Sequence, residues 1–507
     1  MVDPLNWSKK YRMYIAILVS TAIFFCNFLA AGPTVVITEI TADFFGAPPE
    51  NANFVADISK TAYFFTTTAL MQGMGALFWM PLIVKYGRRP VYISSFVLYT
   101  GCAVWAGAST TYSSELASRI IMGMAAGAAE VLAPLTISDI FFLHERGTIM
   151  AVYTCALSTG VSGGIIISGL ISINYHWRVI YWVSTALIGA CTLLVILTFP
   201  ETIYRRDESA ANVVTQDGTK EEVLKLKSTA TCNEALDAEK SSTDNSGPKK
   251  RGYIANLRIF SGVYTKESTI KLFIRPIILF TLPPVFWATL AMAGTIGFLV
   301  AITSNFASAF ATAYNFQPWQ SGLCFVAALV GSFIGIFVGG HFSDWVADIQ
   351  TQRNDGIREP EMRLPAIGVS VITAPLALVL YGVGINNRLH WICPTIGLAL
   401  INFSIVQATN VSLVYTIDSY RPVAGEIVVT QMGFKSAVGF LLSFYTNPWV
   451  QKSGYISAYG AMAGISGGLL ISCLPLYFFG HTIRAKSWAW RHIRMFVHWD
   501  DDREVGE

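Results

Sequence analysis

The sequence contains little charge, and the short motifs of soluble enzymes are missing from it. Charged residues make up 13% of the 507 residues, whereas soluble domains carry about 25%. No glycine-rich GxxxxGK[ST] segment is present to hold the phosphates of a nucleotide. The seven histidines are scattered, with no Ser–His–Asp spacing and no group of metal ligands. We therefore expect no enzyme, no cofactor or metal, and no nucleotide or nucleic-acid partner.

Cysteine is scarce outside the apolar segments. Of eight cysteines, only Cys232 lies clearly outside them, so a disulfide framework is not supported. The first twelve residues, MVDPLNWSKKYR, are too polar and too short for a cleaved signal peptide. The first apolar segment is therefore expected to remain as a membrane anchor.

Long apolar segments are what the sequence has in abundance, with 53% hydrophobic residues. A hydrocarbon core of about 30 Å requires about 20 apolar residues in each helical span. Twelve segments meet this requirement: 13–38, 61–84, 91–109, 114–138, 147–171, 178–199, 278–302, 320–342, 364–384, 391–416, 427–447 and 456–480.

The twelve segments form two groups of six, separated by one long polar stretch. We predict an all-α integral membrane protein whose twelve transmembrane helices form two pseudo-symmetric six-helix lobes around a central cavity. The lobes span residues 13–200 and 278–480, flanked by the N-terminal segment 1–12 and the tail 481–507. Weak internal symmetry of this kind is typical of transporters built from duplicated repeats.

The polar stretch 201–277 is expected to be a cytoplasmic linker. Residues 205–252 are rich in Ser, Thr, Asn, Asp, Glu and Lys and have few aromatic residues, which predicts disorder. Residues 253–276 regain apolar character, and we expect a short surface helix that leads into the seventh span.

Lysine and arginine gather in the loops on one side of the predicted membrane. That side carries the N-terminal segment, the linker, the C-terminal tail and the loops with Arg88, Arg146 and Arg358, whereas the other side is nearly bare. The positive-inside rule therefore predicts that both termini are cytoplasmic. We expect a multi-pass protein of the plasma membrane; a vacuolar membrane stays open.

Three charges stand out inside predicted spans, where charge is costly and usually functional: Arg119, Glu130 and Lys435. Eleven residues separate Arg119 from Glu130, about 16 Å along a helix and only about 20° around it. We expect both on one cavity-facing side, where Glu130 could bind a proton or a cation. Lys435, about 13 Å into its span, could pair with a carboxylate or attract an anionic group. A structural ion pair for Glu130 and snorkelling of Lys435 are the alternatives.

Two further groups of polar residues are candidates. Five amides in the middle of spans could contact substrate or join helices: Asn27, Gln72, Asn402, Gln407 and Gln431. Five charged residues at cytoplasmic helix ends could form a gate that salt bridges hold shut: Arg88, Arg89, Asp139, Asp418 and Glu426. Asp139 and Asp418 each end the fourth helix of their lobe, and ordinary solvated helix ends are the alternative.

Several motifs resemble the major facilitator superfamily, in particular its fungal twelve-span branch of drug:proton antiporters and polyamine and organic-cation permeases. In order along the chain they are Asp3-Pro4-Leu5-Asn6-Trp7, Lys85-Tyr86-Gly87-Arg88-Arg89-Pro90, Arg119-x-x-x-Gly123, Pro200-Glu201-Thr202-x-Tyr204 and Glu359-Pro360-Glu361-Met362-Arg363-Leu364. The set covers almost the whole chain.

Two positions depart from the family pattern. The basic loop usually has a Gly and an Asp upstream of Gly87, where this chain has Met80 and Val84. The inner latch is therefore altered, and Asp139 could take up part of the charge. The fifth-span segment 160–169 keeps most of the glycines of the antiporter motif but lacks its prolines, so the direction of transport stays open.

The resemblance implies a secondary transporter, a monomer that meets a small-molecule substrate in the bilayer and uses the proton gradient as its energy source. We expect export of a drug-like compound or secondary metabolite. Uptake of polyamines or other organic cations is the alternative; Glu130 and the segment 138–142 favour it, whereas the cation Lys435 disfavours it. A membrane sensor that transports nothing is a third possibility.

Overall fold

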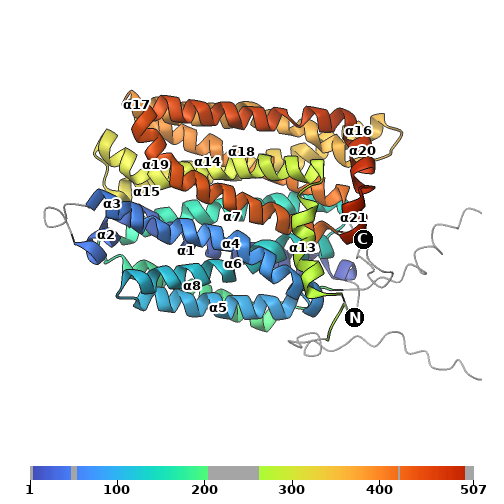
Figure 1. Ribbon diagram of the computed structural model, residues 1–507, viewed down its shortest axis with the longest axis horizontal. Coiled ribbons are helices and arrows are strands. Elements are labelled where there is room, and N and C mark those ends of the chain that lie inside the picture. Colours follow the sequence, from blue (N-terminus) through green and yellow to red (C-terminus); the bar gives the residue numbers. More distant parts are fainter. Residues whose placement is uncertain (1–3, 47–53, 204–261, 266, 421–422, 497–507) are drawn as a thin grey trace, which may run out of the picture.

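The structure, a computed structural model, describes residues 4–46, 54–203, 262–265, 267–420 and 423–496. In these residues the chain forms helices and no strand. The long helices lie side by side in one bundle, and the described ends of the chain lie at the same end of it (Figure 1). The predicted disorder of 205–252, and Cys232, lie outside the described residues.

The N-terminal lobe begins with a short 3-10 turn, η1, before its first long helix. Its elements are η1 (Pro4–Asn6), α1 (Lys9–Ala31), η2 (Gly32–Val36), α2 (Ile37–Phe45), α3 (Phe54–Thr61), α4 (Tyr63–Tyr86), α5 (Arg88–Ala108), α6 (Tyr112–Ile140), α7 (Leu143–Ile171) and α8 (Arg178–Thr198).

A short helix, α13, comes before the C-terminal lobe, in agreement with the surface helix predicted before the seventh span. In order, α13 and the elements of the lobe are α13 (Thr269–Leu279), α14 (Pro283–Tyr314), α15 (Pro318–Ile336), η3 (Phe337–Phe342), α16 (Ser343–Arg353), η4 (Pro360–Ile367), α17 (Gly368–Asn386), α18 (Ile392–Ser419), α19 (Ala424–Ile471), α20 (Leu474–Trp488) and α21 (Arg491–Phe496).

Eleven helical stretches of the described chain are long and apolar enough to cross a membrane. The longest, α19, consists of two helices joined at a kink. Its backbone leaves the helical conformation at Gly454, whose φ of 77° suits a residue without a side chain. Asn305 bonds to Asn447 before this break and to Tyr455 after it, so the chain turns back there. The twelve predicted crossings are therefore present.

Some predicted helix boundaries were wrong. The seventh span was predicted at 278–302, but α14 starts at Pro283 and continues to Tyr314. Pro283 and Pro284 occupy the first helical positions, where a missing N–H costs nothing, so they start the helix and do not kink it. The helix ends at Asn315, which adopts a left-handed conformation with φ of 54°.

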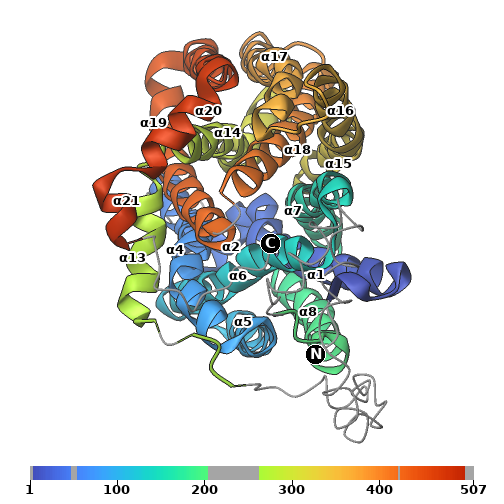
Figure 2. The same ribbon diagram turned by 90° about the vertical axis from the view of Figure 1, so that its right-hand side faces the viewer.

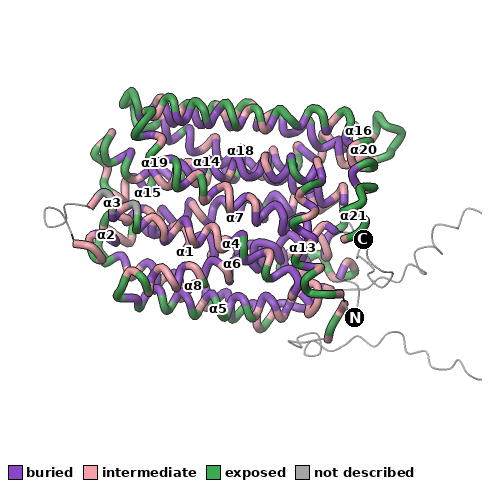
Figure 3. Tube along the Cα trace, in the orientation of Figure 1, coloured by how far each residue is buried: buried purple, intermediate pink, exposed green. Residues whose placement is uncertain are grey.

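The position of each helix in the bundle follows from how much of it is buried. In the most apolar window of α6, 83% of the residues are buried, compared with 39% in α8. Large apolar side chains such as Leu193, Leu197 and Phe478 are more than 60% exposed on the outer faces, as a lipid-facing surface requires (Figure 3). Charges carried by α6 therefore lie inside the protein.

The two lobes meet along α4, α6 and α7 on one side and α15, α18 and α19 on the other, and α14 contacts η2 (Figure 2). Gly73 of α4 shows how close they come, since a Cβ there would lie 2.4 Å from the Cβ of Ser436 in α19. The bundle has two ends: the terminal side carries α20 and α21, and the distal side carries α2 and α3 (Figure 1).

Candidate functional site

A cavity of about 340 Å³ lies between the two lobes. Helices α1, α4, α6 and α7 supply one wall, and α14, α18 and α19 supply the other. The size is within the range of pockets that hold drug-sized molecules, roughly 300–1,000 Å³. Among its described lining residues, only Glu130 and Lys435 carry a charge.

Glu130 of α6 and Lys435 of α19 form an ion pair that joins the two lobes. The Lys435 ammonium donates to Oε1 of Glu130 and also lies 3.5 Å from the sulfur of Met432. Glu130 is 1% exposed and Lys435 is 6% exposed. The second carboxylate oxygen, Oε2, is buried and accepts no hydrogen bond from a described residue. Lys435 therefore pairs with a carboxylate, one of the two roles expected for it, while a functional role for Glu130 beyond this ion pair stays a prediction.

The ion pair lies nearer to the terminal end of the cavity. Lys435 is eleven residues from the start of α19, and Glu130 is ten residues from the end of α6, so each is about 15 Å from the terminal side. Distal to the pair, the lining continues to Ile37, Ile58 and Gln451, near the loops. The cavity therefore extends from the pair toward the distal side.

On the terminal side the lobes are in contact. A Cβ at Gly147, in the first turns of α7, would lie 2.4 Å from Oδ1 of Asp344 in α16. Asn410 of α18 donates to the carbonyl of Gly147 at 3.4 Å. On the other flank, a Cβ at Gly425 would meet Met80 and Leu135. Between the Glu130–Lys435 pair and the terminal side, the two lobes therefore close off the cavity.

Arg119 does not lie beside Glu130 in the cavity, contrary to the expectation of a shared cavity-facing side. It is fully buried inside the N-terminal lobe, 3.2 Å from Oε1 of Glu115. It donates to the carbonyl of Leu29 at 3.0 Å and to the hydroxyl of Tyr181, whose ring lies 4.7 Å from the guanidinium. At this height Leu29 of α1 and Tyr181 of α8 lie against the Arg119 side chain, so its face of α6 is covered.

The five candidate amides divide into two groups. Asn27 and Gln72 line the cavity. Asn402 accepts from Ser158 at 2.7 Å across the lobe interface, and Gln431 donates to Thr416 at 3.0 Å. Gln407 donates to the carbonyl of Ala366 and accepts from Ser370. The last three therefore join helices and are absent from the described cavity lining.

The terminal-side residues of the N-terminal lobe form a network at the start of α5. Arg88 Nε lies 3.1 Å from Asp139 at the end of α6. Glu201 accepts from the backbone N–H groups of Arg88 and Arg89 at 3.0 and 3.2 Å, which satisfies free donors at the N-terminus of that helix. The Arg89 side chain donates to the carbonyls of Phe199 and Ile196. These contacts connect α5, α6 and the segment after α8.

The C-terminal lobe has an equivalent network. Asp418, at the end of α18, lies 3.6 Å from Arg363, which also lies 2.6 Å from Asp344. Glu426, at the start of α19, lies 3.2 Å from the fully buried Arg275 of α13. In each lobe, an Asp at the end of the fourth span therefore pairs with an arginine at the start of the third. Whether these pairs act as a gate stays a prediction.

Sequence reasoning missed several residues of the site. Asn305 of α14 and Asn447 of α19 line the cavity and bond to each other at 2.7 Å, and Tyr455 donates to Asn305 at 2.9 Å. Asn305 lies beyond the predicted end of the seventh span, which hid it. Asp344 follows Gly340 by four residues, the same spacing as between Met80 and Val84 in the first lobe. The Gly and Asp that the family usually has at those two positions are therefore present in the second lobe. This repeat is a sequence signal that indicates Asp344.

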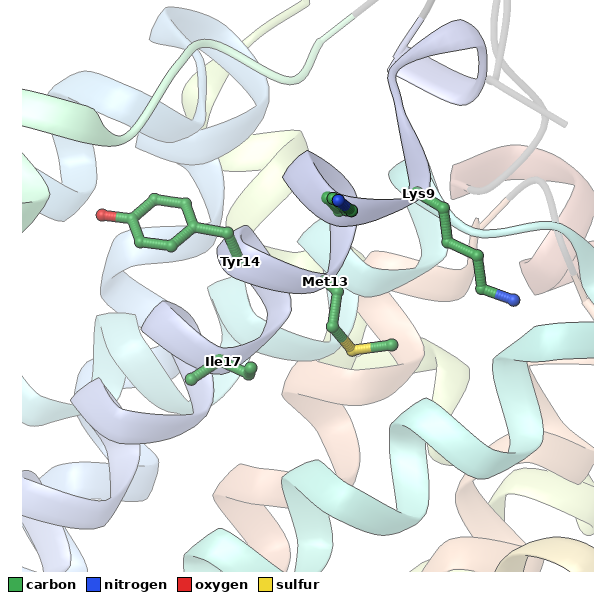
Figure 4. A pocket seen from close by; sticks show the side chains of 5 residues that line it. Lys9, Met13, Tyr14 and Ile17 are labelled. Atoms are coloured by element: carbon green, nitrogen blue, oxygen red, sulfur yellow. The ribbon is translucent and has the colours of Figure 1, made fainter.

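A second hollow, lined by Lys9, Lys10, Met13, Tyr14 and Ile17, lies at the start of α1. The side chains labelled in Figure 4 all come from this one helix. It is therefore a depression on the outside of α1, separate from the space between the lobes. In the described part of the chain, no three His, Cys, Asp or Glu side chains come together in a group that could hold a metal ion.

Two six-helix lobes that close on one side of a central cavity have the architecture of a secondary transporter. The chain matches the Major Facilitator Superfamily over residues 13–428 and belongs to this family. Two solved structures share its fold. The human organic anion transporter MFSD10 (TETRAN) has a TM-score of 0.60 and 12% identity over 91% of this chain and 99% of its own. The proton:xylose symporter XylE, bound to 6-bromo-6-deoxy-D-glucose, has a TM-score of 0.62 and 13% identity over 93% and 96%.

Three fungal relatives match nearly the whole chain. Protein HOL1 of Saccharomyces cerevisiae is 24% identical over 96% of this chain and 89% of its own length. The MFS transporter cpaT of Aspergillus oryzae is 24% identical over 96% and 90%. The efflux pump vrtL of Penicillium aethiopicum is 26% identical over 89% and 82%. This chain is therefore a fungal-type transporter of the family, with many membrane-spanning helices.

Proposed function

We propose that this protein is a proton-coupled exporter of a small, uncharged and largely apolar organic molecule, such as a drug-like compound or a secondary metabolite. The observation that supports this most directly is the charge balance of the cavity. Its two charged side chains, Glu130 and Lys435, bond to each other, so the lining presents no net charge to a substrate. An uncharged molecule would bind there without disrupting the pair.

Glu130 is the proposed coupling residue. A proton that reaches Glu130 from the cavity removes its charge, and with it the attraction that holds Lys435 of α19 to α6. A proton can then favour one arrangement of the lobes over the other, and a substrate that binds one arrangement more tightly can be moved by the gradient. Without such differential affinity, no gradient could drive transport.

The proposed orientation places the terminal side in the cytoplasm. Lysine and arginine are concentrated there, including Lys9, Lys10, Arg88, Arg358 and Arg484, as the positive-inside rule requires. The cavity would then face outward in the plasma membrane, in a monomer, and export would require the terminal side to open. The name of the vrtL relative, an efflux pump, supports export.

Uptake of an organic cation is the second candidate. The buried Oε2 of Glu130, which accepts no hydrogen bond from a described residue, is the observation that favours it. A cationic group could bind to this oxygen. Lys435 opposes this role, because its ammonium already lies at the same carboxylate and would repel a second cation.

The test is efflux from cells that are preloaded with Nile red, an uncharged fluorescent compound, and that contain or lack the chain. We expect faster loss of the dye with the chain, and no difference after an ionophore collapses the proton gradient. Accumulation of labelled spermidine by the same cells would replace the first proposal with the second. Equal dye loss in both cell lines would contradict export.

A further inference from the structure

The distal half of the cavity has two chemically different walls. On the N-terminal lobe, Ala31, Ile37, Ile58, Ala62 and Phe65 present apolar side chains beside the hydroxyls of Thr34 and Thr66. The facing wall of α14 and α19 presents hydroxyls and amides from Ser308, Ser443, Asn447 and Gln451, together with Asn305, beside the apolar Ala307 and Phe440. A molecule between these walls meets mostly apolar surface on one face and the amide groups of Asn305, Asn447 and Gln451 on the other.

The side chains of Tyr455, Asn305 and Asn447 form a chain of hydrogen bonds in which each residue donates to the next. The Tyr455 hydroxyl donates to Oδ1 of Asn305 at 2.9 Å, and Nδ2 of Asn305 donates to Oδ1 of Asn447 at 2.7 Å. The acceptor oxygen of Asn447 is therefore engaged, and its amide group has two N–H donors. Since Asn447 lines the cavity and is only partly buried, those donors are available to a ligand.

This group is separate from the ion pair. Asn447 lies twelve residues after Lys435 in α19, about 18 Å further along the helix. A ligand atom that meets Asn447 is thus far from both charges of the cavity. The Asn447 amide is therefore placed to donate a hydrogen bond to an uncharged acceptor atom of the ligand. The apolar wall opposite can pack against a ring or hydrocarbon face of the same ligand.

We propose that Asn447, held in place by Asn305 and Tyr455, forms a specificity subsite for a carbonyl oxygen on an otherwise apolar ring compound. This inference rests on the proposed function and names its substrate class. Asn447 contacts the substrate, Asn305 fixes the orientation of the Asn447 amide, and Tyr455 acts as a positioning residue through Asn305. An oxygen acceptor at the edge of the ring is what the subsite selects.

The experiment compares 9-fluorenone with fluorene, which share a ring skeleton and differ in one carbonyl oxygen. Efflux of each compound from preloaded cells is measured by chromatography at several concentrations. For the unmodified chain we expect the half-saturating concentration of fluorenone to be about tenfold lower than that of fluorene, which is the contribution of one neutral hydrogen bond. In Asn447→Ala the ratio should fall to about one, and in Tyr455→Phe to an intermediate value of about three.

Asn386→Ala is the matched control, because Asn386 is an exposed amide in α17, outside the cavity lining; it should keep the tenfold ratio. Equal handling of the two compounds by the unmodified chain, or a tenfold ratio that survives Asn447→Ala, overturns the subsite while leaving export intact. Efflux of neither compound above that of cells without the chain would contradict the proposed function and the subsite together.

Discussion

Helix α6 takes part in two buried ion pairs of different kinds. Arg119 pairs with Glu115 of the same helix and donates further to Leu29 and Tyr181, all within one lobe. Glu130, eleven residues later, pairs with Lys435 of the other lobe and keeps one buried oxygen that no described residue bonds. Both pairs lie in the membrane-spanning bundle, yet only the second lines the cavity.

The difference shows that burial alone does not reveal whether a charged residue has a structural or a transport role. Removing one partner of an ion pair that is enclosed in one lobe destabilises that lobe, because an uncompensated charge is left in a dry interior. A pair that bridges two moving bodies beside a cavity can exchange a partner for a proton or a ligand. Substitutions in the two pairs should separate these roles, and their expected effects range from loss of folding to small changes in efflux.

The largest effect should come from Arg119→Leu, which leaves Glu115 buried without its cation. We expect the lobe to lose about 3–5 kcal/mol of stability, with little folded protein in the membrane. Thermal unfolding of the detergent-purified chain measures this. Arg119→Leu combined with Glu115→Leu should recover part of the loss. If Arg119→Leu folded normally and lost only transport, the purely structural assignment would be wrong.

Breaking the bridging pair should affect transport more than folding. Lys435→Met leaves Glu130 beside a cavity, where water can solvate it, so the protein should reach the membrane at near-normal levels. Nile red efflux should fall at least tenfold, because Glu130 loses the partner whose release depends on its protonation. Surface labelling alongside efflux separates the two effects. A variant that exports normally would show that the pair is incidental to transport.

The two lobe–lobe contacts on the terminal side, at Gly147 and Gly425, should differ in how strongly an added methyl group slows efflux. At Gly147 an added Cβ meets the Asp344 carboxylate, whose Oδ1 is fixed by an ion pair with Arg363 at 2.6 Å. Gly147→Ala should therefore hinder closure of the terminal side and slow efflux several-fold. At Gly425 the nearest atom is the end of the flexible Met80 side chain at 2.7 Å, and Gly425→Ala should change efflux less than twofold. The two variants serve as controls for each other. Equal effects would refute the idea that the charged contact is the stricter one.

The smallest effect should come from deleting residues 210–248, which lie in the polar linker and carry none of the site residues. Efflux should stay within twofold of the full-length chain, because each lobe keeps its own helices and the remaining linker still connects them. Efflux per surface-labelled molecule is the measure. Complete loss would show that the linker takes part in transport.

The sequence predicted the number of crossings and the two lobes because apolar length is a local property that each span carries alone. It also predicted Glu130 and Lys435 as cavity residues, since an unpaired charge in an apolar span requires a partner or water. It failed for Arg119, and for Asn402, Gln407 and Gln431 it left open whether they contact substrate or join helices. Their neighbours come from other helices, such as Tyr181 for Arg119, and helical periodicity does not reveal which helix covers a given face.

The break inside α19 and the end of α14 depend on local backbone features that the sequence signals weakly. Gly454 divides α19, and its role follows from a positive φ that many glycines in this chain do not adopt. Asn305 was missed because α14 runs twelve residues beyond its predicted end at 302. Hydropathy marks where a helix can cross a membrane, but not where its polar last turns line a cavity.

Uphill transport shows whether Glu130 couples the proton to movement of the substrate. The purified chain and its Glu130→Gln variant are placed in liposomes with an imposed pH gradient, and Nile red is followed on both sides of the membrane. We predict that the unmodified chain concentrates the dye against its gradient, whereas Glu130→Gln only equilibrates it. Concentration of the dye by Glu130→Gln, with unchanged pH dependence, would contradict the account.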